Sequence, residues 1–222
     1  MRGLALTIFG GPVLAIISYS GFLLVPLGHG GLIQPSCAAL GGLALAAFVL
    51  REKLPPQRML GALVIIIGLA LIAFEALSTI GTHGLLGDLA FVTAGLFFAI
   101  FGMLLRLWRI APIRAAAVVS VISLVDIPIH AIAFGFDRLV AVGLTENLLQ
   151  AAVQGVFAGP LAIYLFARSV VLLGAARAAV FPSLVPGFTL LLGFVVLGEI
   201  PSAVQLLGLV VVIIGFRLTQ RG

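Results

Sequence analysis

Four polar residues in one apolar stretch have the types and the spacing of a binding face on a helix. Ser120, Ser123, Asp126 and His130 are three, three and four positions apart, among apolar neighbours. At 3.6 residues per turn they fall within about 120° of one helix face. A carboxylate and an imidazole there can bind a polar solute, a cation or a proton. We predict that these four residues contact a substrate, and that Pro128 frees a backbone carbonyl beside them.

A second polar arc occurs in the next apolar stretch. Gln154, Tyr164 and Arg168 share about 80° of a helix surface. We predict that they also contact the substrate, with Arg168 favouring an anionic group. The chain has no phosphate-binding glycine loop followed by Lys and Ser or Thr, and no His, Cys and carboxylate cluster at metal-ligand spacing. We therefore expect no metal site, no cofactor and no ATP-driven step.

Each of these polar residues also has a structural interpretation. Asp126 can bond to a neighbouring helix, and His130 can lie at the membrane interface. The serine hydroxyls can bond to carbonyls of their own helix. Arg168 can extend its guanidinium to the nearer membrane surface, and tyrosines such as Tyr164 more often pack than bind ligands.

The remaining acids and histidines are expected to be structural. We expect Glu52 and Glu199 to be turn acids that favour the free N–H groups at the start of the helix that follows each of them. The other acids are expected in water at the ends of spans, and the other histidines in turns; these residues are Glu75, Asp88, Asp137, Glu146, His29 and His83.

The composition places these residues in a membrane protein. The chain is 63% hydrophobic and only 9% charged, whereas soluble domains carry about 25% charged residues. A spanning helix needs about 20 apolar residues. The apolar runs predict an all-α polytopic fold with about eight transmembrane helices, at residues 4–27, 31–50, 57–76, 85–107, 112–134, 148–171, 175–197 and 202–218.

The basic residues predict the orientation and exclude nucleic acid as a partner. The net charge is +5, but the basic residues lie between apolar runs and form no stripe. If alternate gaps face inside, starting with the N-terminus, all 12 Lys and Arg residues except Arg138 face the cytoplasm. We predict a multi-pass protein of the cell membrane, in contact with the lipid bilayer, with both termini in the cytoplasm.

One segment of the chain occurs twice. Residues 35–68 recur as residues 182–215, 147 positions later and without gaps. The shared positions include a Pro-Ser pair, a Leu two residues before a Glu, and two glycines, at Pro35/Pro182, Ser36/Ser183, Leu50/Leu197, Glu52/Glu199, Gly61/Gly208 and Gly68/Gly215. With the spans above, the two copies start on opposite sides of the membrane. This predicts inverted repeats with a binding site between them near the midplane.

The repeated motifs resemble a known family. Leu197-Gly198-Glu199, Leu50-Arg51-Glu52 and Gly87-Asp88-Leu89, together with two Gly-x6-Gly helices, resemble the EamA-type permeases of the drug/metabolite transporter superfamily. That family has two halves of five helices. Residues 1–80 would hold three helices of a first repeat, without its first two, and residues 84–218 the five of a second.

The resemblance implies a function. It implies a secondary permease or exporter of small organic metabolites or drugs, not an enzyme, which works by alternating access and is driven by a coupling proton or ion or by exchange. The missing two helices indicate a fragment, a start assigned too late, or a reduced form that completes itself with a partner, such as a homodimer. Two alternatives stay open: a truncated membrane partner subunit that does not transport, and a membrane-embedded lipid-modifying enzyme.

Overall fold

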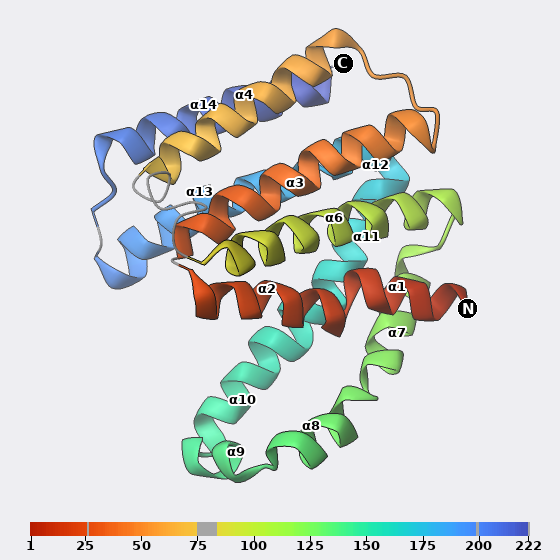
Figure 1. The fold of residues 1–222 in the computed structure, drawn as a ribbon, viewed down its shortest axis with the longest axis vertical. Helices are drawn as coiled ribbons and strands as arrows, with labels where there is room; N and C mark the ends of the chain where they lie inside the picture. Colours follow the sequence, from red (N-terminus) through yellow and green to blue (C-terminus); the bar gives the residue numbers. More distant parts are fainter. Residues whose placement is uncertain (26, 75–83, 199, 222) are drawn as a thin grey trace.

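The described residues are mostly helical, and none of them forms a strand (Figure 1). This structure is a computed structural model, and it describes residues 1–25, 27–74, 84–198 and 200–221. Seven helical stretches in these ranges are long and apolar enough to cross a membrane, and Pro56–Ile72 is a shorter apolar helix of 17 residues. Together they match the eight predicted spans in number and order. The all-α polytopic class is confirmed.

The described residues of the first half form four spans, the first of which is divided into two helices. The first span is two helices, α1 (Arg2–Gly10) and α2 (Pro12–Leu24), which meet at Gly11 because Pro12 starts a new helix. α3 (Leu27–Phe48), α4 (Pro56–Ile72) and α6 (Leu85–Leu107) follow.

The second half is more interrupted. Its elements in chain order are α7 (Pro112–Ser123), α8 (Asp126–Phe134), α9 (Asp137–Val142), α10 (Leu144–Ala152), the π-helix η1 (Val153–Leu161), α11 (Ala162–Leu173), α12 (Ala175–Ala178), the 3-10 helix η2 (Phe181–Leu184), α13 (Val185–Leu192), the π-helix η3 (Gly193–Leu197) and α14 (Ala203–Arg221).

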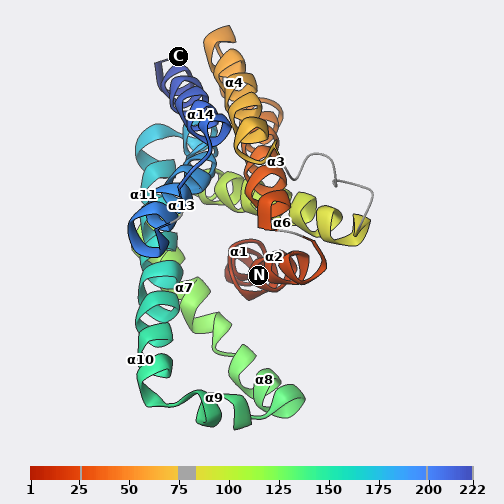
Figure 2. The same ribbon diagram turned by 90° about the vertical axis from the view of Figure 1, so that its left-hand side faces the viewer.

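The helices form a bundle with a projecting arm. α3 packs against α6 and α4, and α6 also packs against α2. The arm consists of α8, α9 and α10, which extend away from the bundle (Figure 2). One end of the bundle carries most of the arginines, including Arg51, Arg106 and Arg109, and we call it the basic end. In Figure 1 the starts of α1 and α4 and the ends of α3 and α6 lie at this end.

α4 and α14 cross at glycines and run antiparallel. A Cβ added to Gly68 would lie 2.8 Å from the Gly208 carbonyl oxygen, and one added to Gly61 would lie 2.8 Å from the Gly215 carbonyl oxygen. The first glycine of each helix therefore faces the second glycine of the other. Only residues without a side chain allow two helix backbones to approach so closely.

The turns after the two repeated helices also share a backbone conformation. Arg51 has φ 54° and Gly198, its counterpart 147 positions later, has φ 71°. Both are left-handed, a conformation that costs an ordinary residue about 1–2 kcal/mol and glycine almost nothing. Arg51 therefore has a positive φ like that of the glycine at its counterpart position. An inverted duplication would produce this turn and the antiparallel glycine contact, although the duplication itself stays a prediction.

Candidate functional site

A cavity of about 650 Å³ lies between helices from both halves of the chain, and we call it the central cavity. Its polar lining residues are Ser18 and Tyr19 of α2 and Gln34 of α3, and no lining residue is charged. The rest is apolar and largely aromatic. Ligand sites of about 300–1,000 Å³ with mostly apolar walls and a few polar groups suit small organic molecules. This wall favours a molecule without net charge.

Aromatic rings form one wall of the central cavity. Phe166 of α11 stacks on Phe101 of α6, with ring centroids 6.0 Å apart, and contacts Phe98 with centroids 4.4 Å apart. Gly10 lies directly against the ring of Phe101, where an added Cβ would be 2.5 Å away. The break between α1 and α2 at Gly11 thus sits against this aromatic wall.

Towards the end opposite the basic end, the central cavity has a thin wall. A second cavity of about 440 Å³ lies there. Phe22, Gln34, Pro182 and Val185 line both cavities. The two spaces are therefore separated by one layer of side chains, and Phe22 is the aromatic member of this layer.

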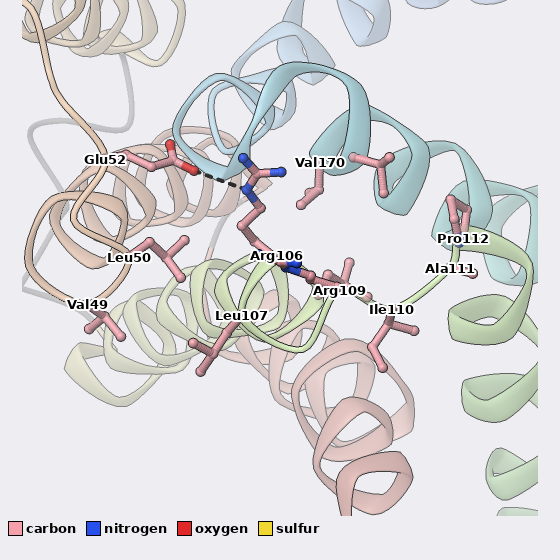
Figure 3. Close-up of a pocket in the computed structure, with 12 residues that line it drawn as sticks. Val49, Leu50, Glu52, Arg106, Leu107, Arg109, Ile110, Ala111, Pro112 and Val170 are labelled. Carbon is pink, nitrogen blue, oxygen red and sulfur yellow. Dashed lines mark ion pairs between the residues drawn. The ribbon is translucent and has the colours of Figure 1, made fainter.

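Towards the basic end, the wall of the central cavity shares no lining residue with the next cavity. This third cavity of about 690 Å³ lies between Leu50, Arg106 and Pro112 (Figure 3). One buried cluster lies between the two cavities. Its Leu105 and Val170 line the third cavity, whereas its Phe101 lines the central cavity.

Glu52 ties the basic end together. Its carboxylate accepts hydrogen bonds from the backbone N–H groups of Ala175 (3.3 Å) and Ala176 (3.4 Å), and its Oε1 lies 3.5 Å from Arg106 Nε (Figure 3). The expectation that Glu52 favours the helix that follows it is wrong, because it caps α12 in the other half. α4 starts with Pro55-Pro56, which offer no N–H to a carboxylate. Glu199, Glu75 and His83 lie outside the described residues.

The four residues of the predicted fifth-span face do not share one continuous helix. α7 ends at Ser123 and α8 begins at Asp126. Pro128 has no N–H for the Leu124 carbonyl, which instead accepts from the Ile127 N–H at 3.1 Å. The helix therefore breaks one turn before the proline, and the 3.6-residue period does not carry through.

The structure places these four residues in different surroundings. Ser123 donates to the Val119 carbonyl at 2.6 Å, which is the back-bonding that the sequence allowed. Ser120 and Asp126 are half-buried. His130 is exposed on the arm, with its ring 6.3 Å from that of Phe136.

The second predicted arc is also interrupted. Gln154 belongs to the π-helix η1, which contains Pro160, whereas Tyr164 and Arg168 lie one turn apart on α11. Gln154 and Arg168 are exposed and Tyr164 is half-buried. None of the seven residues predicted from sequence lines the three cavities described above. Their contact with substrate stays a prediction.

Sequence reasoning missed a buried His–Asp pair. His29 Nδ1 of α3 lies 2.6 Å from Asp88 Oδ1 of α6, and the side chains are 0% and 7% exposed. The expectations of a turn histidine and a solvated aspartate are wrong. The glycines around His29 indicated a turn, but α3 already begins at Leu27, since glycine is common in membrane helices. Asp88 lies in the first turn of α6, within an apolar run where an unpaired carboxylate would be costly, and this was the signal that the sequence offered.

Comparisons with known proteins agree with this architecture. The sequence model described as "EamA-like transporter family" matches residues 85–220. A solved structure titled "Crystal structure of protein" superposes with a TM-score of 0.74 at 18% sequence identity, over 99% of this chain and 75% of that chain. At this identity the likeness shows a shared fold. The comparison with curated protein sequences finds no match.

Proposed function

This chain belongs to the EamA-like transporter family, and we propose that it is a secondary transporter of small organic molecules without net charge, working by alternating access. The family membership makes it a membrane transporter of the drug/metabolite type. The substrate class and the mechanism are our proposals.

The central cavity is the observation that carries the proposal. It lies between helices of both halves, it has the volume of a small-molecule site, and its polar groups are limited to two hydroxyls and one amide. Such a lining can orient a solute through a few hydrogen bonds. It offers no counter-ion for a charged one, whose burial in an apolar site would be unfavourable.

The different walls at the two ends support alternating access. At one end the central cavity shares four lining residues, including Phe22, with the neighbouring cavity, and at the basic end a buried cluster and the Glu52 contacts lie between it and the third cavity. The antiparallel contact of α4 with α14 supports the inverted repeats on which such rocking mechanisms are built. We keep Asp126 and the other six residues predicted from sequence as candidate contacts in a second state.

Transport by the purified protein in liposomes tests the proposal. The probes are phenylalanine as a zwitterion, uridine as an uncharged solute, lactate as an anion and tetraphenylphosphonium as a cation. We expect protein-dependent flux of at least one probe without net charge. Ala162→Trp, which fills the central cavity, should abolish it, whereas Ala151→Trp on an exposed part of α10 should not.

Two results would contradict the proposal. Flux of the charged probes alone would remove the substrate class, and equal flux in the two tryptophan variants would remove the central cavity as the site. The alternatives from sequence predict otherwise: a partner subunit would move no probe until a second protein is added, and a lipid-modifying enzyme would change the liposome lipids.

A further inference from the structure

The buried His29–Asp88 pair has a chemical property that the central cavity lacks, because it can take up a proton. The pair joins the first turn of α3 to the first turn of α6, at the end of the bundle opposite the basic end. With a neutral imidazole and an ionised carboxylate, the pair carries a charge of −1. One added proton makes it neutral overall, as an ion pair or as two neutral groups sharing hydrogen bonds.

The surroundings make that charge difference important. Phe91, one turn after Asp88 on α6, is 0% exposed. Val25, the residue that follows α2, packs on Gly84 and Gly87 just before Asp88. In such apolar surroundings a net charge is much less favourable than a neutral pair. Proton uptake should therefore stabilise the packed arrangement of α2, α3 and α6, and proton release should loosen it.

The pair is linked by direct packing to the thin wall of the central cavity. Gly30, the residue after His29, touches the rings of both Phe22 and Phe91, where an added Cβ would lie 2.5 and 2.8 Å away. Those two rings meet edge to face, with centroids 4.8 Å apart. A displacement of α3 relative to α6 at His29 therefore moves Phe22, which separates the two cavities.

Few titratable groups occur among the described residues of α3 and of the elements packed against α3 and α6. Cys37 lies two turns further along α3, and Tyr19 lies on α2 at the central cavity. Most of the cations lie towards the basic end. The titratable groups of the packed elements α1, α2, α4, α11 and α12 are Arg2, Tyr19, Arg58, Tyr164, Arg168 and Arg177. Glu75 and His83 lie outside the described residues.

We propose that His29–Asp88 is a proton-binding site whose protonation holds the thin wall at Phe22 closed and whose deprotonation opens it. This rests on the proposed function, because it assigns the coupling ion of that transporter. A proton bound here would be released to the side on which the wall opens. A proton gradient would thereby drive the opening of the thin wall through the packing of α3 against α6.

The test measures opening without any substrate, so that its failure and the failure of the proposed function are distinguishable. The protein carries Cys37→Ala to remove its one cysteine and Val25→Cys as the reporter, because Val25 is 7% exposed against Gly84 and Gly87. The labelling rate with a charged maleimide is measured in lipid nanodiscs from about pH 5.5 to about pH 8.5. Thiol reactivity itself rises with pH. Each labelling rate at Val25→Cys is therefore divided by the rate at a Leu86→Cys reporter at the same pH. Leu86 lies on α6 and is 73% exposed.

We expect the labelling ratio to rise about tenfold between the lowest and the highest pH, as the closed population falls. Asp88→Asn, which stays neutral and keeps a hydrogen-bond partner for His29, should hold the ratio low at every pH. Asp137→Asn, an exposed acid on α9, should leave the rise intact. If Asp88→Asn does not fold, His29→Gln is used instead, and it should remove the rise or move its midpoint by at least about one pH unit.

A flat ratio in the parent protein would overturn the proposal. An unchanged pH profile in a folded variant of the pair would also overturn it. Substitution in a merely structural pair would change expression or stability but not the pH profile of labelling.

Discussion

The crossing of α4 and α14 gives the sharpest test of the packing, through Gly68→Ala. A Cβ at Gly68 would lie 2.6 Å from the Val212 nitrogen and 2.8 Å from the Gly208 carbonyl oxygen. Ordinary contacts begin at 3.4 Å, so the helix backbones must separate by about 0.6–0.8 Å. A gap of that size removes about a quarter to a half of the van der Waals attraction in each contact between the two helices. Overpacking of this kind costs about 1–3 kcal/mol.

Gly31→Ala is the matched control for this variant. Gly31 is also a helical glycine, in α3, but a Cβ there would meet nothing within 4 Å. Both substitutions gain the same helix propensity, about 1 kcal/mol, so this contribution cancels in the comparison. We expect Gly68→Ala to be less stable than Gly31→Ala by about 1–3 kcal/mol.

The free energy of unfolding is measured by titration with dodecyl sulfate in mixed micelles. The signal is the fluorescence of Trp108, the one tryptophan of the chain, which the guanidinium of Arg2 faces at 5.7 Å. If Gly68→Ala is as stable as Gly31→Ala, α4 and α14 do not approach as closely as the structure shows. The antiparallel contact would then no longer support the inverted repeats.

Four further outcomes are expected. Arg51→Gly should raise the unfolding free energy by about 1 kcal/mol in the same titration, because it relieves a left-handed φ of 54°. Glu52→Gln should lower it by about 0.5–1 kcal/mol by weakening the contacts to α12 and Arg106, whereas Glu146→Gln on exposed α10 should not. Phe22→Ala should raise the rate of maleimide labelling of a Ser18→Cys reporter several-fold. Phe48→Ala is the control, because Phe48 is 85% exposed, and it should leave the rate unchanged. Equal labelling rates in the two variants would show that Phe22 does not separate the two cavities. Asp126→Asn should abolish flux in liposomes at unchanged membrane abundance, and normal flux would remove Asp126 from the transport path.

The parts of the fold that depend on composition and local pattern could be predicted from the sequence. The eight apolar runs predicted the seven candidate spans and the shorter helix α4 in order, because an apolar run of membrane length has few other stable conformations. The two Gly-x6-Gly helices could be identified from the sequence by their repeated spacing, and the structure places their glycines at the crossing of α4 and α14. Neither result needed knowledge of which helices are neighbours in space.

The candidate site required that knowledge. Asp88 is 59 positions from His29, and Ala175 is 123 positions from Glu52. Spacing along one helix cannot identify partners at such separations. The predicted polar faces assumed a constant 3.6 residues per turn, whereas the helix break before Pro128 and the π-helix around Pro160 change that period. The central cavity is mostly apolar, so its lining residues looked like ordinary packing.

α3 connects the two ends of the site, and its two polar links differ in kind. At one end His29 holds α3 to α6 through a buried pair that can gain or lose a proton. At the other end Glu52, just beyond α3, contacts Arg106 of α6, whose side chain is 48% exposed. Salt screens an exposed ion pair, whereas it hardly affects a buried one. High salt should therefore weaken the Glu52–Arg106 ion pair at the basic end. It should leave the pH response of the opposite end unchanged, because the two links hold α3 independently of each other.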